Sequence, residues 1–289
     1  MKSLIKFTFY AVSFSLFVTG GAFAQTDGLS SSSKEPLEVT ADGTLEWLRE
    51  QKQFVATKNA LAKQGESSVA GEKLTAFYRE GKDGSNTDIY QVTAQQDVIL
   101  RSRDSTVYGQ DAIYNLDEGL ATVTGDNLKM ISPDQTVTAR DKFEYWVADG
   151  RVNALGNAKV VRPKLQGGND TLQANKISAI LKKNEKGEQV LHSLEAIGNV
   201  IIVTPGETIT GAYGIYKADT NKAELTGGVK ILRGPNTLEG KRAIVDMNTN
   251  ISTIYADGKA VDGQSSDVVP GGRVRGVFYP GSEEKPDTP

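Results

Sequence analysis

The chain has no cysteine and a single histidine among its 289 residues. Without cysteine there can be no disulfide framework, no thiolate metal site and no cysteine nucleophile. A His-based zinc site or a Ser-His-Asp triad would depend on His192 alone, which lies in the strand-like segment 190–194. Aromatic residues are also scarce, at 7% of the chain with two tryptophans, whereas sugar-binding sites usually stack aromatic rings on the ligand. These absences argue against an enzyme, and we predict no metal and no cofactor.

A strong excess of charge of one sign is missing as well. The sequence has 33 Lys and Arg against 36 Asp and Glu, which gives a formal net charge of −3. Proteins that bind nucleic acid by neutralising its phosphates present a basic surface. A phosphate-binding loop of the GxxxxGK(S/T) type is also absent from the sequence. We therefore predict no nucleic-acid partner.

A long apolar run is found only near the start of the chain. Residues 7–18 are almost uniformly apolar, follow two lysines and precede the segment Ala22-Phe23-Ala24. The run is shorter than the ~20 residues that a membrane-spanning helix needs, and the arrangement is typical of a secretory signal peptide. We predict a signal peptide at 1–24 with cleavage after Ala24, and a destination in the periplasm or outside a bacterial cell.

Glycine occupies 30 positions, and much of it belongs to a phrase that recurs along the body of the chain. The phrase reads glycine, polar, apolar, any residue, apolar, and we interpret it as a turn followed by a strand. Internal prolines follow it by seven or eight residues and indicate a second turn in each unit. Clear copies are 156–160, 198–202 and 227–231, looser copies begin at Gln96 and Gly125, and the prolines are Pro133, Pro163, Pro205 and Pro235.

A second phrase alternates with the first: a β-former, any residue, then alanine or glycine. It ends at Gly71, Gly109, Ala139, Ala174, Gly211 and Gly240. Together the phrases predict units of two to three strands per roughly 30 residues, whose side chains alternate between a buried and a solvated face. The segment 45–62 fits helix or strand, and the alternation after it favours strands. Because such a unit cannot bury its apolar face alone, we predict units stacked along one axis.

The organisation expected from these patterns is a linker at 25–36, one elongated all-β body at 37–262 and a disordered tail at 263–289. Within the tail, 272–280 is an alternative candidate for a short docking strand. The strand edges at the two ends of the body are open, and a β protein must either cap such edges or use them for pairing.

The clearest copies of both phrases resemble the OstA domain of LptA-like proteins. The resemblance is carried by the start at 37–42, by Gly-Asn-Val-Ile-Ile at 198–202 and by the related segments 107–114 and 209–216. It implies an all-β, antiparallel fold, an elongated twisted β-jelly roll built from stacked strand-turn repeats. It also implies a periplasmic bridge protein that carries lipopolysaccharide from the inner to the outer membrane, with the lipid A moiety in an apolar groove.

The resemblance further implies partners. These are inner-membrane and outer-membrane lipopolysaccharide transport components bound by edge-strand pairing, and other copies of the chain in head-to-tail self-association. Two alternatives stay open from the residues alone: a structural β module that binds envelope proteins by strand-edge pairing without lipid, and a carbohydrate-active β-solenoid. The apolar residues that we predict to line the groove are Val98, Leu100, Leu128, Met130, Phe143, Val160, Ile177, Val200, Ile202, Ile215, Val229 and Ile231.

Overall fold

The computed structural model describes residues 36–80, 87–164, 167–185, 189–246, 248–249, 251–257 and 272–279. The predicted signal peptide at 1–24, nearly all of the predicted linker and most of the predicted tail lie outside the described residues. Every helix or strand in the described part is a β-strand, including those in the ambiguous segment 45–62, and the all-β prediction is confirmed. The described part has no helix long and apolar enough to cross a membrane.

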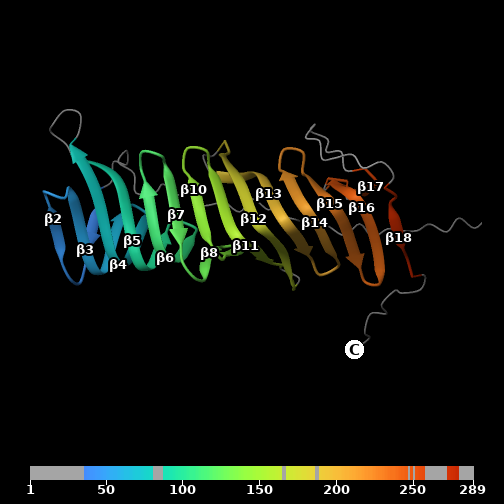
Figure 1. Ribbon diagram of the computed structural model, residues 1–289, viewed down its shortest axis with the longest axis horizontal. Coiled ribbons are helices and arrows are strands. Elements are labelled where there is room, and N and C mark those ends of the chain that lie inside the picture. The colour runs from blue at the N-terminus through green and yellow to red at the C-terminus, as the bar shows by residue number, and fades with distance from the viewer. Residues whose placement is uncertain are drawn as a thin grey trace, which may run out of the picture.

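The strands form one antiparallel sheet, and Figure 1 shows them following one another in chain order along the long axis. They are β1 (Glu38–Thr40), β2 (Leu45–Leu48), β3 (Gln53–Gln64), β4 (Ser67–Glu80), β5 (Thr87–Arg101), β6 (Thr106–Asn115), β7 (Leu120–Thr124), β8 (Leu128–Ser132), β9 (Gln135–Ala139), β10 (Lys142–Trp146), β11 (Arg151–Pro163), β12 (Asn169–Lys183), β13 (Gln189–Val203), β14 (Thr208–Lys217), β15 (Lys222–Arg233), β16 (Asn236–Asp246), β17 (Ile251–Tyr255) and β18 (Arg275–Val277).

Long strands are bent at a corner near the middle. In β11 the corner holds two consecutive residues with positive φ, Gly156 (84°) and Asn157 (47°), and the register with β12 shifts there. Side chains disfavour positive φ, so glycine and asparagine fit such a corner best. The same pair of conformations occurs at 58–59, 96–97, 198–199 and 227–228. The recurring glycine phrase is therefore a β-bulge inside a strand, which corrects its interpretation as a turn between strands.

The second phrase places a small residue opposite each corner. Gly109 of β6 pairs with Val98, just past the corner of β5. A Cβ atom at Gly109 would lie 2.4 Å from Cγ1 of Val123, and one at Gly240 would lie 2.3 Å from Cγ2 of Ile254. The first phrase thus marks the bulge of one strand. The second phrase marks the position beside that bulge on the next strand, where there is no room for a larger side chain.

The corners fold the sheet along its length into two facing leaves. The first leaf ends at turns that form the first rim, at 65–66, 102–105, 133–134, 204–207 and 234–235. The second leaf ends at turns that form the second rim, at 49–52, 116–119, 147–150 and 218–221. Residues on both sides of one corner, such as Ala154 and Val160 of β11, belong to the same buried core between the leaves. The protein is therefore an elongated, antiparallel β-jelly roll, as the sequence predicted.

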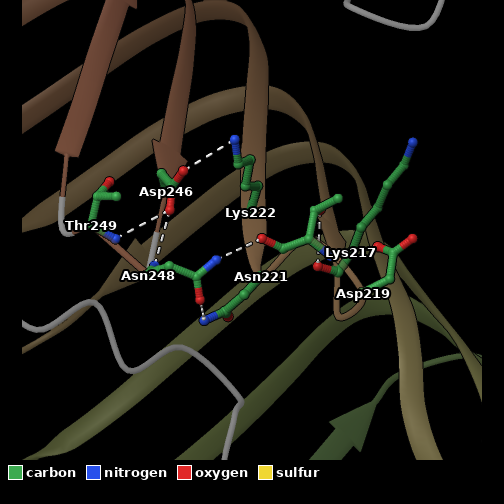
Figure 2. A network of polar contacts seen from close by, with 8 residues as sticks. Lys217, Asp219, Asn221, Lys222, Asp246, Asn248 and Thr249 are labelled. Carbon is green, nitrogen blue, oxygen red and sulfur yellow. Dashed lines mark hydrogen bonds and ion pairs between the residues drawn. The ribbon is translucent and has the colours of Figure 1, made fainter.

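Polar contacts tie neighbouring turns of the second rim together near the C-terminal end, as Figure 2 shows. The Asn221 Nδ2 donates a hydrogen bond to Asn248 Oδ1 (2.9 Å), and Asn248 Nδ2 donates one to the Thr220 carbonyl oxygen (3.0 Å). Lys222 Nζ lies 3.1 Å from Asp246 Oδ2. These contacts join the β14–β15 turn to the turn that follows β16 and fix the spacing of the rim.

Each end of the sheet finishes with a long strand whose outer edge is covered by two short ones. At the N-terminal end, β1 pairs with the first-leaf half of β3 and β2 with its second-leaf half. At the C-terminal end, β17 covers the second-leaf half of β16 and β18 covers its first-leaf half. The segment 272–280, named above as a candidate docking strand, thus contains the paired strand β18.

Candidate functional site

A cavity of about 400 Å³ lies between the two leaves. It extends over the strands from β4 to β14, and its size falls in the range of ligand pockets. Its walls are largely apolar, and the larger aliphatic and aromatic residues that line it include Leu100, Val107, Met130, Phe143, Val160, Ile177, Leu181, Leu191 and Leu194. A cavity with such walls suits an apolar ligand, because it offers few hydrogen-bonding groups.

Small side chains on the second leaf leave the space for this cavity. Four alanines of the second leaf line it, whereas the facing first leaf contributes larger residues such as Leu100 and Met130. The alanines are Ala94, Ala112, Ala154 and Ala179. Toward the C-terminal end the interior is filled instead, since Ile209, Leu225, Val229 and Val245 are almost completely buried against one another in the core. The interior therefore changes from an open groove to a packed core along the length of the molecule.

The two rims of the cavity differ in polarity. The first rim contributes serines, Asp134 and Gln135, together with two arginines at strand ends, Arg101 and Arg162. The second rim contributes mainly apolar residues, among them Val147, Val190 and Ala218. The serines of the first rim are Ser67, Ser68, Ser102, Ser105 and Ser132. An amphipathic ligand in the cavity would thus meet hydrogen-bond donors and positive charge along the first rim.

Tyrosine hydroxyls supply further polar groups in the second leaf. Burial raises the pKa of the Tyr114 hydroxyl, and the neighbouring Tyr145 acts in the same direction. Gln189 Nε2 donates a hydrogen bond to the Tyr145 hydroxyl oxygen at 3.2 Å. The Tyr216 hydroxyl donates to Asn221 Oδ1 at 3.2 Å, and burial raises its pKa as well. The Tyr114 and Tyr216 hydroxyls therefore stay uncharged at neutral pH and give the wall hydrogen-bonding capacity without charge.

One carboxylate, Glu144 of β10, also borders the cavity. Burial acts to raise its pKa, but hydrogen bonds from Lys142 and Asn153 outweigh burial, and the net effect lowers the pKa. Asn153 Nδ2 donates to Glu144 Oε2 at 3.1 Å, and Lys142 forms an ion pair with the same carboxylate. Glu144 is thus held as an anion by its own neighbours. Among the described residues, no group of three or more His, Cys, Asp or Glu side chains is placed to hold a metal ion.

The structure divides the predicted groove residues into three groups. Leu100, Met130, Phe143, Val160 and Ile177 line the cavity. A second group is buried in the core, with side chains packed against other protein atoms: Val98, Leu128, Val200, Ile202, Val229 and Ile231. The remaining residue, Ile215, is partly exposed and belongs neither to the core nor to the cavity wall.

The position of Ile215 corrects its assignment to the interior. Some strands lie beside the bulged corner of a neighbouring strand and carry the small residue of the second phrase there. In two of them, the next inward residue comes three positions after that small residue: Ala112 after Gly109 in β6, and Ile177 after Ala174 in β12. An odd spacing reverses the side-chain alternation at the corner. In β14 this rule places Gly214 and Tyr216 on the inner face and Ile215 on the outer face.

Sequence reasoning missed two classes of cavity residue. The alanines were not recognised as wall residues, although an alanine at an inward position is a direct signal of free volume. The tyrosines Tyr114 and Tyr216 were missed because the reversal at the corner hides their inward orientation, whereas Tyr145 was missed although it shares the inward parity of Phe143. Both signals become readable once the corner is known to lie inside the strand.

Comparisons with known proteins relate the body of the chain to one family. The family model described as LptA/(LptD N-terminal domain) LPS transport protein matches residues 38–141 and again 141–251, so the family unit occurs twice in succession. Among solved structures, the chain is similar to LptH, described as the LptA homologous periplasmic component of the conserved lipopolysaccharide transport device from Pseudomonas aeruginosa. The identity is 14%, the match covers 85% of this chain and 96% of that chain, and the TM-score is 0.22. A sequence comparison with curated proteins gives no match.

Proposed function

This chain belongs to the LptA/LptD N-terminal domain family of lipopolysaccharide transport proteins, and from that premise we propose that it binds lipopolysaccharide and carries it across the periplasm. In this proposal the chain bridges components at the inner membrane and the outer membrane. The cavity between the leaves is the observation that carries the proposal, because a filled jelly roll would have no place for a lipid. No chemical step is required, since binding and release along an apolar path are sufficient.

The walls of the cavity support a role in holding acyl chains. Leu100, Met130 and Phe143 come from three different strands and meet at the same cavity. Transferring apolar surface from water to such a wall is favourable by roughly 25 cal/mol per Å². An acyl chain therefore gains by entering the groove. The Tyr145 and Tyr216 hydroxyls do not oppose this, because each is already hydrogen-bonded within the protein.

The first rim supports a role in orienting the lipid headgroup. Lipid A carries anionic phosphates, and arginine binds phosphate in a bidentate manner with strong, charge-assisted hydrogen bonds. Arg101 and Arg162 stand at this rim beside several serine hydroxyls. We expect the headgroup to face the first rim while the acyl chains lie between the leaves.

We further propose a periplasmic location, with the signal peptide at 1–24 cleaved after Ala24. The partners in this proposal are lipopolysaccharide transport components at both membranes and other copies of the chain in head-to-tail association. Within the described residues, the outer edges of β1, β2, β17 and β18 pair with no other strand, and such edges suit this pairing because their backbone groups can extend the sheet into a neighbour.

One alternative function has an observation in its favour. The interior over β15 and β16 holds fully buried side chains such as Leu225, Val229 and Val245, and the cavity that extends from β4 to β14 does not reach these strands. A structural module that pairs with envelope proteins by its strand edges would need only such a packed core.

A photocrosslinking experiment separates the two functions. A photoreactive amino acid at Leu100 or Met130 faces the cavity, whereas the neighbouring positions Ile99 and Ile131 face outward and serve as matched controls. We expect lipopolysaccharide to be captured in cells from Leu100 and Met130 and not from the two controls, with the adduct detected by immunoblotting.

Capture from the outward positions alone would contradict the groove. Absence of lipid from all four positions, together with capture of proteins from terminal strands, would favour the structural module. The four variants alter single residues on opposite faces of the same two strands, and thermal unfolding checks that each variant keeps the fold.

A further inference from the structure

Two tyrosines stand on either side of an alanine in the second-leaf wall of the cavity. Ala121 of β7 pairs with Tyr114 of β6 on one side and with Tyr145 of β10 on the other, and all three residues line the cavity. Each tyrosine is the last residue but one of its strand, so both lie beside the second rim. The small alanine leaves space between the two rings on the side of the cavity.

The hydroxyl groups of these tyrosines have hydrogen-bonding capacity that the protein does not use. Within the part of the chain that the structure describes, the Tyr114 hydroxyl forms no hydrogen bond, although Tyr145 and burial both raise its pKa. The Tyr145 hydroxyl oxygen accepts a hydrogen bond from Gln189 Nε2 at 3.2 Å, which leaves its own O–H free to donate. Both hydroxyls can therefore still bind a further polar group.

Gln189 holds the Tyr145 hydroxyl in place at some cost to the fold. The residue begins β13 and is only 9% exposed, and its Oε1 is buried with no hydrogen-bond partner among the described residues. A buried polar atom without a partner is unfavourable and needs an explanation. The hydrogen bond to Tyr145 is one, because it directs the tyrosine O–H away from the glutamine amide.

The surroundings of the two hydroxyls are apolar and offer no free charge. Val147, Val152 and Leu181 line the same part of the cavity, and Val152 pairs directly with Tyr145. The carboxylate of Glu144 is already occupied by Lys142. A charged ligand group would lose its hydration here without gaining an opposite charge, whereas an uncharged polar group would gain hydrogen bonds.

The unused groups favour a hydroxyl over other uncharged polar groups. The Tyr114 hydroxyl can both donate and accept, and Tyr145 can still donate. An ester carbonyl can only accept, whereas a hydroxyl both accepts and donates. Because the walls on both sides are apolar, the hydroxyl must be attached to an apolar chain. Because the tyrosines lie beside the rim, that hydroxyl must be near the polar end of the chain.

We propose that Tyr114 and Tyr145 form a binding site for a hydroxyl group carried on an acyl chain, with Gln189 as the positioning residue for Tyr145. The cavity then distinguishes hydroxylated acyl chains from plain ones. This inference rests on the lipid-binding role in the proposed function and names the part of the ligand that these residues recognise. The two tyrosine hydroxyls donate to the ligand oxygen, and the ligand hydroxyl donates in turn to the Tyr114 oxygen of a neighbouring orientation or to water at the rim.

A pair of fatty acids of equal length tests the proposal: tetradecanoic acid and its 3-hydroxy derivative. Isothermal titration calorimetry gives the Kd of each for the full chain, and the ratio of the two values cancels any change that a substitution makes to the apolar wall. We expect Tyr114→Phe and Tyr145→Phe each to lower the preference for the hydroxylated chain by about threefold to tenfold, the effect of one hydrogen bond. Thermal unfolding checks that the variants keep the fold.

Tyr108→Phe is the matched control. Tyr108 lies on β6 like Tyr114, but its side chain is exposed on the outer face, so its loss should leave the ratio unchanged. An unchanged ratio in both cavity variants would overturn the proposal, and water would then be the partner of these hydroxyls. An equal fall of the ratio in the Tyr108 variant would overturn it as well.

Gln189→Leu tests the positioning role. We expect it to lower the ratio by a smaller factor than Tyr145→Phe, because the hydroxyl remains but is no longer oriented. An unchanged ratio would overturn the role of Gln189, since Tyr145 would then be oriented by packing alone.

The outcome can be separated from that of the proposed function. Binding of plain tetradecanoic acid reports on the apolar cavity, whether or not a hydroxyl site exists. Equal ratios in all variants with both fatty acids bound would overturn only the hydroxyl site. Failure of either fatty acid to bind the unsubstituted chain would count against the acyl-binding cavity and hence against the function itself.

Discussion

At the scale of single residues, the corner glycines fulfil two different requirements. Gly227 (φ 83°) and Gly228 (φ 79°) occupy the same corner of β15 and both have positive φ. A Cβ atom at Gly227 would lie 2.4 Å from the Cβ of Ala212, whereas one at Gly228 would meet no atom within 4 Å. Gly228 is therefore required only by its backbone conformation, and Gly227 is required by both conformation and space.

This difference predicts unequal effects of the same substitution. Gly228→Ala is expected to lower the free energy of unfolding by about 1 kcal/mol, the cost of a left-handed conformation in a residue with a Cβ. Gly227→Ala is expected to cost about 3 kcal/mol, because relieving the clash with the Cβ of Ala212, on the exposed side of the corner, requires a backbone shift that adds to that strain. Equilibrium unfolding in urea measures both values, and equal losses would show that the clash is relieved by a small backbone shift.

The residue scale also shows what could be predicted from the sequence. Apolar alternation identified Phe143, Val160 and Ile177 as inward residues, because each strand half keeps a period of two. It failed at Ile215, because the reversal of alternation depends on a bulge whose φ angles are not visible in the sequence. It also could not identify the cavity, which depends on the volume that Ala112 and Ala154 leave unfilled across the two leaves.

At the scale of elements, β17 is fixed to the sheet by a buried arginine. The Arg242 side chain is only 8% exposed, and its Nη1 lies 3.5 Å from Glu224 Oε1 on β15. Its guanidinium carbon stands 4.0 Å from the ring centre of Tyr255 on β17, and its Nη2 lies 3.6 Å from Asp257 Oδ1. One side chain of β16 thus connects the strands on both of its sides.

Arg242→Ala is expected to destabilise the protein by about 2 kcal/mol, since hydrogen bonds to charged groups that are shielded from water contribute about 1.5–3 kcal/mol each. In the Arg242→Ala variant, the rate of amide exchange with solvent is expected to increase more in β17 than in β15, relative to the unsubstituted protein. Hydrogen exchange measured by mass spectrometry checks the local effect.

Arg151→Ala is a suitable control. Arg151 also has an acidic partner and an aromatic neighbour, Asp149 at 3.2 Å and Trp146 at 5.5 Å, but its side chain is 45% exposed. Exposed ion pairs contribute up to about 1 kcal/mol. A loss at Arg242 no larger than that at Arg151 would show that β17 is held by backbone pairing alone.

Elements were predicted more reliably than their connections. The prolines Pro133, Pro205 and Pro235 lie in turns of the first rim, as expected for residues that cannot donate to a strand ladder. The corners were mistaken for turns, because a glycine followed by asparagine supplies positive φ equally well in a turn and in a bulge. Only pairing on both sides of the corner distinguishes the two, and pairing is a property of the neighbouring strands.

At the scale of the whole molecule, stability is built from neighbouring strands. Contacts between strands are concentrated in pairs that are adjacent in the sheet, as in repeat proteins. Residues 151–155 of β11 and 193–197 of β13 pair with the same residues of β12, 176–180, from its two sides. Residues 151–155 could therefore take the place of 193–197 beside β14 without a change of register. One full unit of two strands can therefore be removed without changing the register of the rest.

Deleting 156–197 joins Leu155 to Gly198 and keeps one corner. We expect this chain to unfold cooperatively, with a maximum dimension in X-ray scattering that is shorter by about 10 Å, the width of two strand spacings. Deleting 157–197 leaves one extra residue in the corner and is the control, because a slip of one residue turns side chains to the wrong face. Equal cooperativity of the two chains would contradict a strict register.

The line of corners along the molecule has a mechanical consequence. The backbone hydrogen bonds run along each leaf and around the corners, whereas only side chains touch across the interior. Moving the two leaves apart about the corners would therefore separate side chains without breaking a ladder hydrogen bond. In the proposed function, a lipid that entered from the side between the rims would replace only those side-chain contacts.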